Sequence, residues 1–324
     1  MTIVRGDYGR QMGRYVANRL MMLIPTLFVV SIVVFGLQKL LPGDVAIALA
    51  GEDKDPTVIA EIRAHYHLDR SMLTQYAYWL GDVLQGDLGH SMRNQISVLE
   101  LIRTKLPATT MLSAIAMAWA LVIGVPTGIF SALRKESWLD YLSNVVGLAG
   151  LSVPPFWLGL MLILLISVDL GWLPASGYVS PFEDLGDCIR SLLMPSFVLG
   201  ANVAGVIMRH TRSAMLTAMS ADYIRTARAK GLSRRVIIVR HGFRNALVPL
   251  ITVSALQLGA LLSGAVLTEQ VFTIPGFGRL IVDSVYTRDY SVVQGVVLTT
   301  ATIYMLLNLL ADLAYAVADP RVRR

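Results

Sequence analysis

Long apolar runs recur along this chain and restrict it to folds that place helices in lipid. About 20 mainly apolar residues cross a hydrocarbon core ~30 Å thick. Six runs approach or exceed that length, at residues 20–41, 109–133, 142–168, 192–208, 246–267 and 292–316. Each is predicted to be a helix, because lipid-facing backbone must satisfy its own hydrogen bonds. With 55% hydrophobic and 15% charged residues, we expect an all-α, polytopic membrane protein with six transmembrane helices.

Lysine and arginine indicate how these helices are oriented. If both termini are cytoplasmic, the inner segments hold 18 of the 28 cations, and the short outer loops hold only Arg190, Arg279 and Arg288. The other seven cations lie between Lys39 and Lys105, where the rule weakens because long loops are translocated regardless of charge. Both termini are therefore predicted to be cytoplasmic, and the net charge of +6 is attributed to inner loops rather than to nucleic-acid binding.

The chain divides into four parts on this interpretation. They are a cytoplasmic N-terminus with the first transmembrane helix, an outer (periplasmic) helical segment, a core with the other five helices, and a cytoplasmic tail, at residues 1–41, 42–106, 107–316 and 317–324. Within the core, residues 209–245 form an inner loop. The alternative for the N-terminus is a signal peptide cleaved near ALAG (48–51). A retained anchor is favoured, because the apolar run exceeds the roughly 7–15 residues usual for a signal core.

The outer segment carries helix signals. Asp55 and Pro56 form a typical N-cap and first-turn pair. Two apolar stripes at helical spacing follow, formed by Ile59, Ile62 and Tyr66 and then by Leu73, Tyr76, Leu80 and Leu84. His65, His67 and His90 lie in the same segment, but their spacing matches no metal motif such as H-E-x-x-H. We therefore assign no metal ligands and no catalytic residues.

Polar residues are rare in the predicted spans. Four polar residues that lie within the spans or at their ends are singled out here, Asn202, Gln257, Asn308 and Asp312. Such groups are candidates for lining a path through the membrane, but they often only tie helices together, and both alternatives stay open. Pro154 and Pro155 are predicted to kink the third span, because proline removes helix hydrogen bonds.

The inner loop 209–245 contains nine cations, and each would cost about 2.5–3.5 kcal/mol at the centre of a membrane helix. Its alanine-rich stretch ADYIRTARAK favours a helix. Gly231 is typical of the left-handed position that follows a helix, and Ser233 is a candidate cap for a second helix starting near Arg234. A compact helical knob outside the membrane is therefore predicted.

Two partners fit this knob equally well on physical grounds. Tyr223, Ala227 and Lys230 share one helix face at i, i+4 and i+7. A protein socket would exploit the small Ala227 for close approach and Leu232 as an apolar tip, and its carboxylates would pair with the arginines. Anionic lipid would attract each cation by about 1 kcal/mol. Nucleic acid is disfavoured, because the loop has no series of aromatic side chains for stacking.

Two stretches in and just after this inner loop resemble a motif of a known protein family. DYIRTARAKGL (222–232), followed by RNALVP (244–249), is similar to the coupling motif of permease subunits of ATP-binding cassette (ABC) importers, most closely the dipeptide/oligopeptide permease family. In the family pattern Glu-Ala-Ala-x-x-x-Gly, Ala227 and Gly231 match, and Arg225 and Thr226 replace the first two residues, as is typical of the peptide branch. Further signatures follow the family's order, namely LLPGD (40–44), GDLGHS (86–91), TEQVFTIPGFGRLIVDSVYTRDYSVVQG (268–295) and ADPRVRR (318–324).

The resemblance implies a B-type permease with the type I ABC importer fold, multi-pass in a bacterial inner (plasma) membrane and not an enzyme. The implied partners are a homologous second permease, two ATP-binding subunits, an external substrate-binding protein and the surrounding membrane lipid. ATP and Mg would bind to the ATPase subunits; this chain has no G-x-x-x-x-G-K-[ST] loop and would hold no cofactor. The implied cargo is a di- or oligopeptide, with glutathione or a nickel chelate as alternatives.

The resemblance also implies functional residues. Docking of the ATPase is expected at Tyr223, Arg225, Thr226, Ala227, Arg228, Ala229, Lys230, Gly231 and Leu232. Contact with the binding protein is expected at Phe272, Pro275, Gly276, Phe277, Gly278 and Arg279. The proline and glycines of IPGFGR are equally consistent with a tight turn that contacts no partner.

Two other classes compete with this interpretation. A self-contained secondary transporter would show paired broken helices, inverted halves and embedded carboxylates, and embedded charge is nearly absent here. A membrane enzyme would need a clustered catalytic set, which the five scattered histidines do not supply.

Overall fold

The computed structural model describes residues 5–40, 45–50, 55–65 and 67–318. Every named element within these residues is a helix, which confirms the all-α prediction. Tyr66 and most of the LLPGD and ADPRVRR signatures lie outside the described residues.

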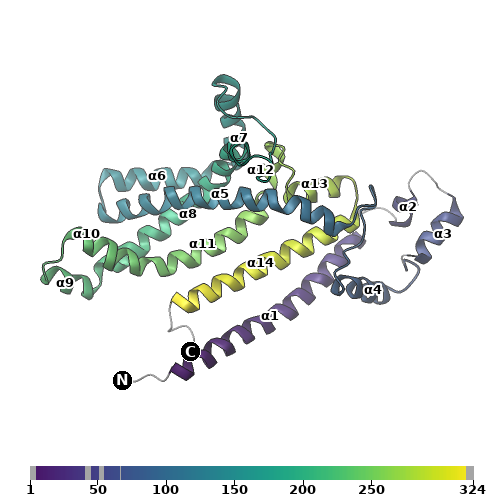
Figure 1. Ribbon diagram of the computed structural model, residues 1–324, viewed down its shortest axis with the longest axis horizontal. Helices are drawn as coiled ribbons and strands as arrows, with labels where there is room; N and C mark the ends of the chain where they lie inside the picture. Colours follow the sequence, from purple (N-terminus) through teal and green to yellow (C-terminus); the bar gives the residue numbers. More distant parts are fainter. Residues whose placement is uncertain (1–4, 41–44, 51–54, 66, 319–324) are drawn as a thin grey trace.

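Long helices run alongside one another and form the body of the protein (Figure 1). They are α1 (Arg5–Leu40), α5 (Val98–Leu133), α6 (Trp138–Ser152), α8 (Leu185–Ser220), α11 (Arg244–Gly264) and α14 (Tyr290–Ala318). One end of the bundle, called the α9 end, carries α9 (Asp222–Ala229), α10 (Arg234–Val236) and the π-helix η2 (Ile237–Phe243). The opposite α13 end carries α2 (Val45–Ala50), α3 (Pro56–His65), α4 (Met72–Leu84), α12 (Val266–Val271) and α13 (Phe277–Tyr286).

Five helical stretches of the described chain are long and apolar enough to cross a membrane. They are Val16–Gly36, Val98–Leu133, Leu185–Ser220, Arg234–Leu262 and Tyr290–Leu313. The predicted third span is instead a broken pair, in which α7 (Pro155–Leu162) and η1 (Ile163–Asp169) are bent by 98° from α6. Counting that pair as one span gives six. The predicted fourth span, 192–208, lies within a much longer helix, since α8 begins at Leu185 and ends at Ser220.

The break between α6 and α7 is sharper than the kink predicted at Pro154 and Pro155. Val153 and Pro154 both have extended backbone, with ψ of 123° and 130°. A proline pushes the residue before it out of the helical region, and the two successive prolines act on Val153 and Pro154 in turn. Helix α7 then starts at Pro155, a first-turn position where the missing N–H would have no partner in any helix.

The backbones of α5 and α8 almost touch. A Cβ added at Gly124 would lie 2.7 Å from the carbonyl oxygen of Ala204, and one at Gly128 would lie 2.6 Å from that of Met208. In the same way, a Cβ at Gly205 of α8 would lie 2.6 Å from a carbonyl oxygen of α6. Small residues permit this approach where helices associate in lipid mainly by van der Waals contact. Helices α5, α6 and α8 therefore form one tightly packed unit.

The outer segment is attached to α1 through α4. Tyr76 packs edge-on against Phe35 with ring centroids 5.5 Å apart, and its hydroxyl lies 2.7 Å from Ser31 Oγ. The second predicted stripe, which joined Leu73, Tyr76, Leu80 and Leu84 on one packed face, is only partly right. Leu73 and Leu84 are 82% and 79% exposed. The aromatic side of α4 faces α1, and these two leucines lie away from it.

The predicted start of α3 is confirmed. The helix begins at Pro56, and Asp55 Oδ1 accepts hydrogen bonds from the N–H and hydroxyl of Thr57, at 2.9 and 2.7 Å. These hydrogen bonds lower the pKa of the Asp55 carboxyl below its ordinary range.

We expect Gly128→Leu to destabilise the bundle, because the new side chain must push α5 away from the Met208 carbonyl. Overpacking of this kind typically costs about 1–3 kcal/mol. Thermal unfolding of the purified protein in detergent measures the effect. Gly36→Leu on α1 is the matched control, since a Cβ there meets nothing within 4 Å. Equal melting temperatures for the two variants would contradict the close approach of α5 and α8.

Candidate functional site

Helix α9 is short and two-sided. Ile224 and Ala227 are 1% and 5% exposed and cluster with Ile237 of η2, and Met219 near the end of α8 packs against that cluster. Residues three apart lie on one helix face, so this pair forms the inner side of α9. The other side chains of the helix are exposed.

Gly231 reverses the chain after α9. Its φ is +71°, its N–H donates to the carbonyl oxygen of Arg228 at 3.0 Å, and the N–H of Leu232 donates to that of Ala227 at 3.3 Å. This pair of bonds is a Schellman motif, and the left-handed glycine is as predicted. Ser233 occupies the predicted N-cap of α10, but its side chain makes no capping hydrogen bond, so that detail of the prediction was wrong.

The structure separates the predicted docking residues into two groups. The exposed ones are Tyr223, Arg225, Thr226, Arg228, Ala229, Lys230, Gly231 and Leu232. Ala227 is buried within this chain, so the expectation that it shares an outward face with Tyr223 and Lys230 was wrong. It lies instead on the side of Ile224 and fixes α9 to η2.

The π-helix η2 joins this end to the rest of the bundle. A Cβ added at Gly242 would lie 2.8 Å from Met219 Sδ, so η2 packs directly on the end of α8. At its other end η2 continues into α11 at Arg244. Short π-helical stretches are frequent at functional sites. Helix α9 is therefore joined to the bundle in two ways, through α8 and, by way of η2, through α11.

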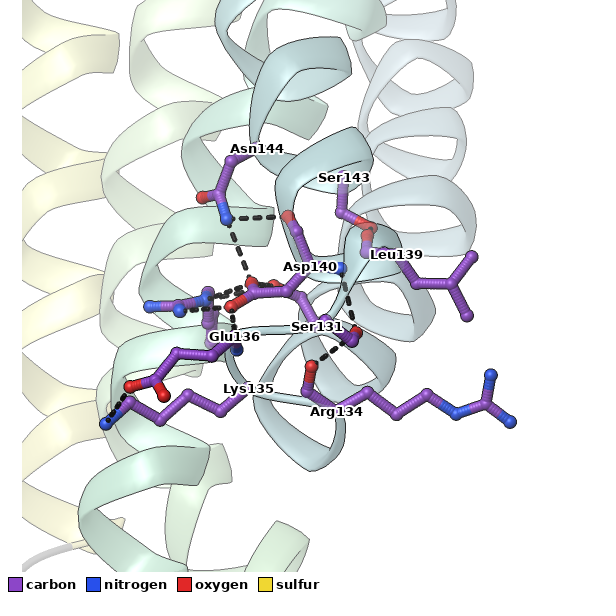
Figure 2. A network of polar contacts seen from close by, with 10 residues as sticks. Ser131, Arg134, Lys135, Glu136, Leu139, Asp140, Ser143 and Asn144 are labelled. Carbon is purple, nitrogen blue, oxygen red and sulfur yellow. Dashed lines mark hydrogen bonds and ion pairs between the residues drawn. The ribbon is translucent and has the colours of Figure 1, made fainter.

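A buried carboxylate joins three helices near the α9 end (Figure 2). Asp140, which is 3% exposed, accepts hydrogen bonds from Nε and Nη2 of Arg212, both at 2.8 Å. It also accepts from Ser131 Oγ at 2.5 Å, from Asn144 Nδ2 at 2.9 Å and from the backbone N–H of Glu136 at 3.0 Å. Helix α5 supplies the serine, α6 the aspartate and asparagine, and α8 the arginine.

This network was missed by the sequence analysis. Arg209 and Arg212 were assigned to an inner loop, whereas both lie on α8. A count of cations cannot show which of them is paired. The available signal was Asp140, an acid two residues before a predicted span, since a carboxylate at that depth needs a cationic or hydrogen-bonding partner.

At the α13 end, a fully buried Glu269 holds the turn that precedes α13. It accepts hydrogen bonds from Thr109 Oγ1 at 2.5 Å and from the N–H of Arg279 at 2.8 Å, while the N–H of Phe277 donates to Thr109 Oγ1 at 2.7 Å. The N-cap residue of α13 is Gly276, which has no side chain to accept a hydrogen bond from the first turn. Glu269 caps the helix in its place. Burial raises the pKa of Glu269 above its ordinary range, although the donors act in the opposite direction.

Most of the predicted binding-protein contacts lie inside this turn. Phe272, Gly276, Phe277 and Gly278 are buried, and Pro275 and Arg279 are half-buried. A Cβ at Gly276 would lie 2.2 Å from Cδ of Glu269, so the carboxylate excludes any side chain there. These observations favour the structural turn over direct contact for the four buried residues. The exposed residues between Phe272 and Tyr290 are Thr273, Asp283, Val285, Tyr286, Thr287 and Arg288.

A second buried acid links the outer segment to α14. Asp289 accepts hydrogen bonds from Ser91 Oγ and, at 3.1 Å, from the N–H of Met92. Ser91 belongs to GDLGHS and Asp289 to the long outer-loop signature, 198 residues later. A Cβ at Gly295 would lie 2.4 Å from Cγ1 of Val98, so the two segments also pack without a gap. Two sequence signatures therefore form one structure.

An open hollow of about 560 Å³ lies between the loop that follows η1 and the start of α8. The N–H of Gly177 donates to the carbonyl oxygen of Phe272 at 3.1 Å and fixes this loop beside α12. Asp187 and Arg190 line the hollow with opposite charges. A guanidinium N–H of Arg190 donates to the carbonyl oxygen of Trp172 at 3.2 Å, which orients the side chain.

Comparison with known proteins gives consistent matches over nearly the whole chain. Residues 124–324 match the family described as the binding-protein-dependent transport system inner membrane component, and residues 12–113 match the N-terminal region of such membrane components. The chain belongs to this family. It is therefore a permease subunit of an inner-membrane ABC importer, as the resemblance implied. Permeases of this class work with a second permease, ATPase subunits and a substrate-binding protein.

Individual relatives agree with the family. The glutathione transport system permease protein GsiC of Escherichia coli O6:H1 is 41% identical over 309 residues, covering 95% of this chain and 98% of that protein. The dipeptide transport system permease protein DppB of Alkalihalophilus pseudofirmus is 40% identical over 329 residues, covering 95% and 99%. In fold, the permease resembles the inward-facing MetNI methionine ABC transporter, with a TM-score of 0.57 at 18% identity over 68% of this chain and 96% of that one.

The four path candidates of the permease have different surroundings. Asp312 pairs with Arg19 of α1 at 3.1 Å, which favours the helix-tying alternative for this residue. Asn308, one turn earlier on α14, has a buried Oδ1 with no hydrogen-bond partner among the described residues. Asn202 and Gln257 are half-buried on α8 and α11. A role in lining the path stays a prediction for these three.

Glu269→Gln is expected to destabilise the permease at neutral pH. The amide NH₂ replaces one acceptor oxygen and faces either the Thr109 hydroxyl or the N–H groups of α13, and an unsatisfied buried group costs about 1–3 kcal/mol. Melting temperatures of the purified importer measure the change. Glu183→Gln, at an exposed glutamate in the loop before α8, is the control. A melting temperature unchanged by Glu269→Gln would contradict the capping role.

The same variant tests the direction of the pKa shift. Because the pKa of Glu269 is raised on folding, the folded permease binds more protons than the unfolded chain around that pKa. The stability contributed by this group is therefore present at low pH and is lost as pH rises through the folded-state pKa. The wild-type melting temperature should show this decline, and Glu269→Gln should lack it. An identical pH dependence in the two proteins would contradict the shift.

Proposed function

We propose that the permease docks onto an ATPase subunit through the exposed side of α9 and the chain reversal at Gly231. The observation that carries this proposal is the two-sided construction of α9. Ile224 and Ala227 fix the helix to α8 and η2, whereas Tyr223 and Leu232 are 42% and 39% exposed. A rigidly held helix with exposed apolar groups suits a protein socket better than water. The α9 end is then cytoplasmic, in agreement with the distribution of cations.

The charge of this surface indicates an acidic socket. From Asp222 to Arg244 the chain carries seven lysines and arginines and one acid. That acid, Asp222, lies 3.7 Å from Arg225, but both side chains are almost fully exposed, so the pair contributes little. Anionic lipid is the competing occupant of such a surface. A protein socket and a lipid surface can be separated by experiment, because only a protein socket makes ATPase binding depend on this surface.

The transport cycle follows from this arrangement. Binding of ATP and Mg by the ATPase subunits displaces α9, and α8 and η2 carry the displacement into the bundle. The permease, which itself binds no nucleotide in this scheme, supplies half of the pathway and a homologous second permease the other half. Switching between inward- and outward-open states requires the partners to stabilise the two states unequally. The substrate-binding protein delivers cargo at the α13 end.

We further propose that the cargo is a short peptide. The two relatives are named for glutathione, which is itself a tripeptide, and for dipeptides. The hollow beside α12 offers Arg190 for a carboxylate and Asp187 for an ammonium group, the two charged ends of a free peptide. Its volume of about 560 Å³ is within the range of small-molecule sites. A nickel chelate is the alternative cargo within the same class of importer.

Leu232→Asp should leave membrane insertion intact and abolish import. The Leu232 side chain is exposed at the tip of the chain reversal. The substitution therefore places a negative charge in the proposed socket without disturbing the bundle. Co-purification of ATPase subunits with the tagged permease, and ATP hydrolysis by the reconstituted importer, measure the effect. Arg134→Glu reverses an exposed charge at the same end, in the turn after α5, and serves as the control. Normal ATPase co-purification with Leu232→Asp would contradict docking and support lipid contact.

Reconstituted importer with its binding protein should take up a labelled dipeptide. Unlabelled dipeptide should compete, whereas a dipeptide with acetylated and amidated ends should not, because it carries neither terminal charge. Arg190→Ala should raise the dipeptide concentration needed for half-maximal import and leave ATPase co-purification unchanged. Uptake of glutathione without uptake of any dipeptide would contradict the dipeptide assignment while retaining the importer class.

A further inference from the structure

The buried network around Asp140 is placed where a displacement of α9 enters the bundle. Helix α8 is continuous from Arg212 to Ser220, so the pair is about 12 Å along the helix from the end that leads into α9, at 1.5 Å per residue. Between them, Met215 and Ala218 are buried. Any movement of α9 that α8 transmits therefore passes the Asp140–Arg212 pair.

Apart from this network, α6 makes no hydrogen bond or ion pair with another helix among the described residues. Its outward face is exposed and apolar, with Trp138, Tyr141, Val145 and Val146 each at least 60% exposed. Its inward face meets α8 through close backbone contact at Gly147 and Gly205. The Met208 side chain packs over Gly147 and the Leu151 side chain over Gly205, so this contact resists separation and sliding by shape, without any directed bond.

The Asp140–Arg212 pair adds directed bonds to this steric fit. Both guanidinium bonds are 2.8 Å long and engage both carboxylate oxygens, and this fork geometry fixes direction as well as distance. The hydroxyl of Ser131 on α5 and the N–H of Glu136 in the intervening turn also donate hydrogen bonds to the Asp140 carboxylate. Asp140 is almost completely buried, and the Arg212 side chain is 25% exposed. A slide of α8 relative to α6 would break several of these bonds at once.

We propose that Asp140 and Arg212 act as a transmission clamp that makes α5, α6 and α8 follow α9 as one body. They are positioning residues, which act on the path through the helices and touch neither ATPase nor cargo. The inference rests on the proposed docking of α9. It goes beyond that docking by naming the residues that convert ATPase movement into movement of α6 and, beyond the 98° break, of α7 and η1.

The clamp predicts a specific kind of failure. If α6 no longer follows α8, the ATPase still docks on α9 and still hydrolyses ATP, but the pathway opens less often in each cycle. Import per ATP hydrolysed should therefore fall, while ATPase co-purification and binding-protein-stimulated hydrolysis persist. A purely structural role would lower import and hydrolysis together. The ratio of the two rates is therefore the informative quantity.

The test uses the complete importer in proteoliposomes, with dipeptide import and ATP hydrolysis measured on the same sample. Asp140→Asn keeps the shape and removes the charge, and should lower import per ATP by roughly tenfold, within the range usual for coupling between sites. Arg212→Lys keeps the charge, loses the fork and should give a smaller decrease. Lys135→Gln is the matched control, because it breaks an exposed 3.1 Å pair with Glu136 in the same turn.

The outcomes separate the clamp from the docking proposal. An unchanged ratio in Asp140→Asn, or import and hydrolysis that fall in proportion, would overturn the clamp. If Asp140→Asn does not assemble, Asn144→Ala removes one 2.9 Å bond to Asp140 without leaving a charge unpaired, and the same ratio decides. Failure of docking gives a different result, in which Leu232→Asp retains both its ATPase and its import.

Discussion

The near-contact of the α5 and α8 backbones is the constraint on which the rest of the structure depends. Gly124 and Gly128 leave no room for a side chain opposite the carbonyl oxygens of α8, and α6 approaches α8 in the same manner through Gly205. In lipid, apolar side chains gain little by leaving their surroundings, so tight van der Waals fit has to hold helices together. The three-helix unit built in this way is the frame to which both ends of the permease are attached.

Polar chemistry is concentrated at the two ends of that frame. Asp140 near the α9 end, and Glu269 and Asp289 at the α13 end, are buried carboxylates that bridge segments remote in the sequence. A buried carboxylate is costly unless hydrogen bonds satisfy it, and each of these three receives several donors. The middle of the bundle is thus held by shape and its ends by directed bonds, and the directed bonds fix the register of the helices.

Local patterns predicted the helices, the left-handed Gly231 and the cap of α3, because each depends on neighbouring residues. Features that depend on remote partners were missed or wrongly assigned. Arg212 was counted as a loop charge, the length of α8 was underestimated, and Ala227 was placed on the wrong side of α9. For IPGFGR the sequence left a partner contact and a structural turn equally open, and the burial of Gly276, Phe277 and Gly278 favours the turn. The break at Pro154 was anticipated, but its angle depends on packing that no local pattern contains.

The conformation of Gly231 has a genetic consequence. Every single-nucleotide change of a glycine codon that alters the amino acid introduces a Cβ, and a Cβ at φ +71° costs roughly 1–2 kcal/mol. No one-step missense route leads away from this position without backbone strain, whereas Arg228 and Lys230 beside it are exposed and can be substituted without such strain. Missense changes at this codon should therefore distort the chain reversal itself, whichever amino acid they introduce.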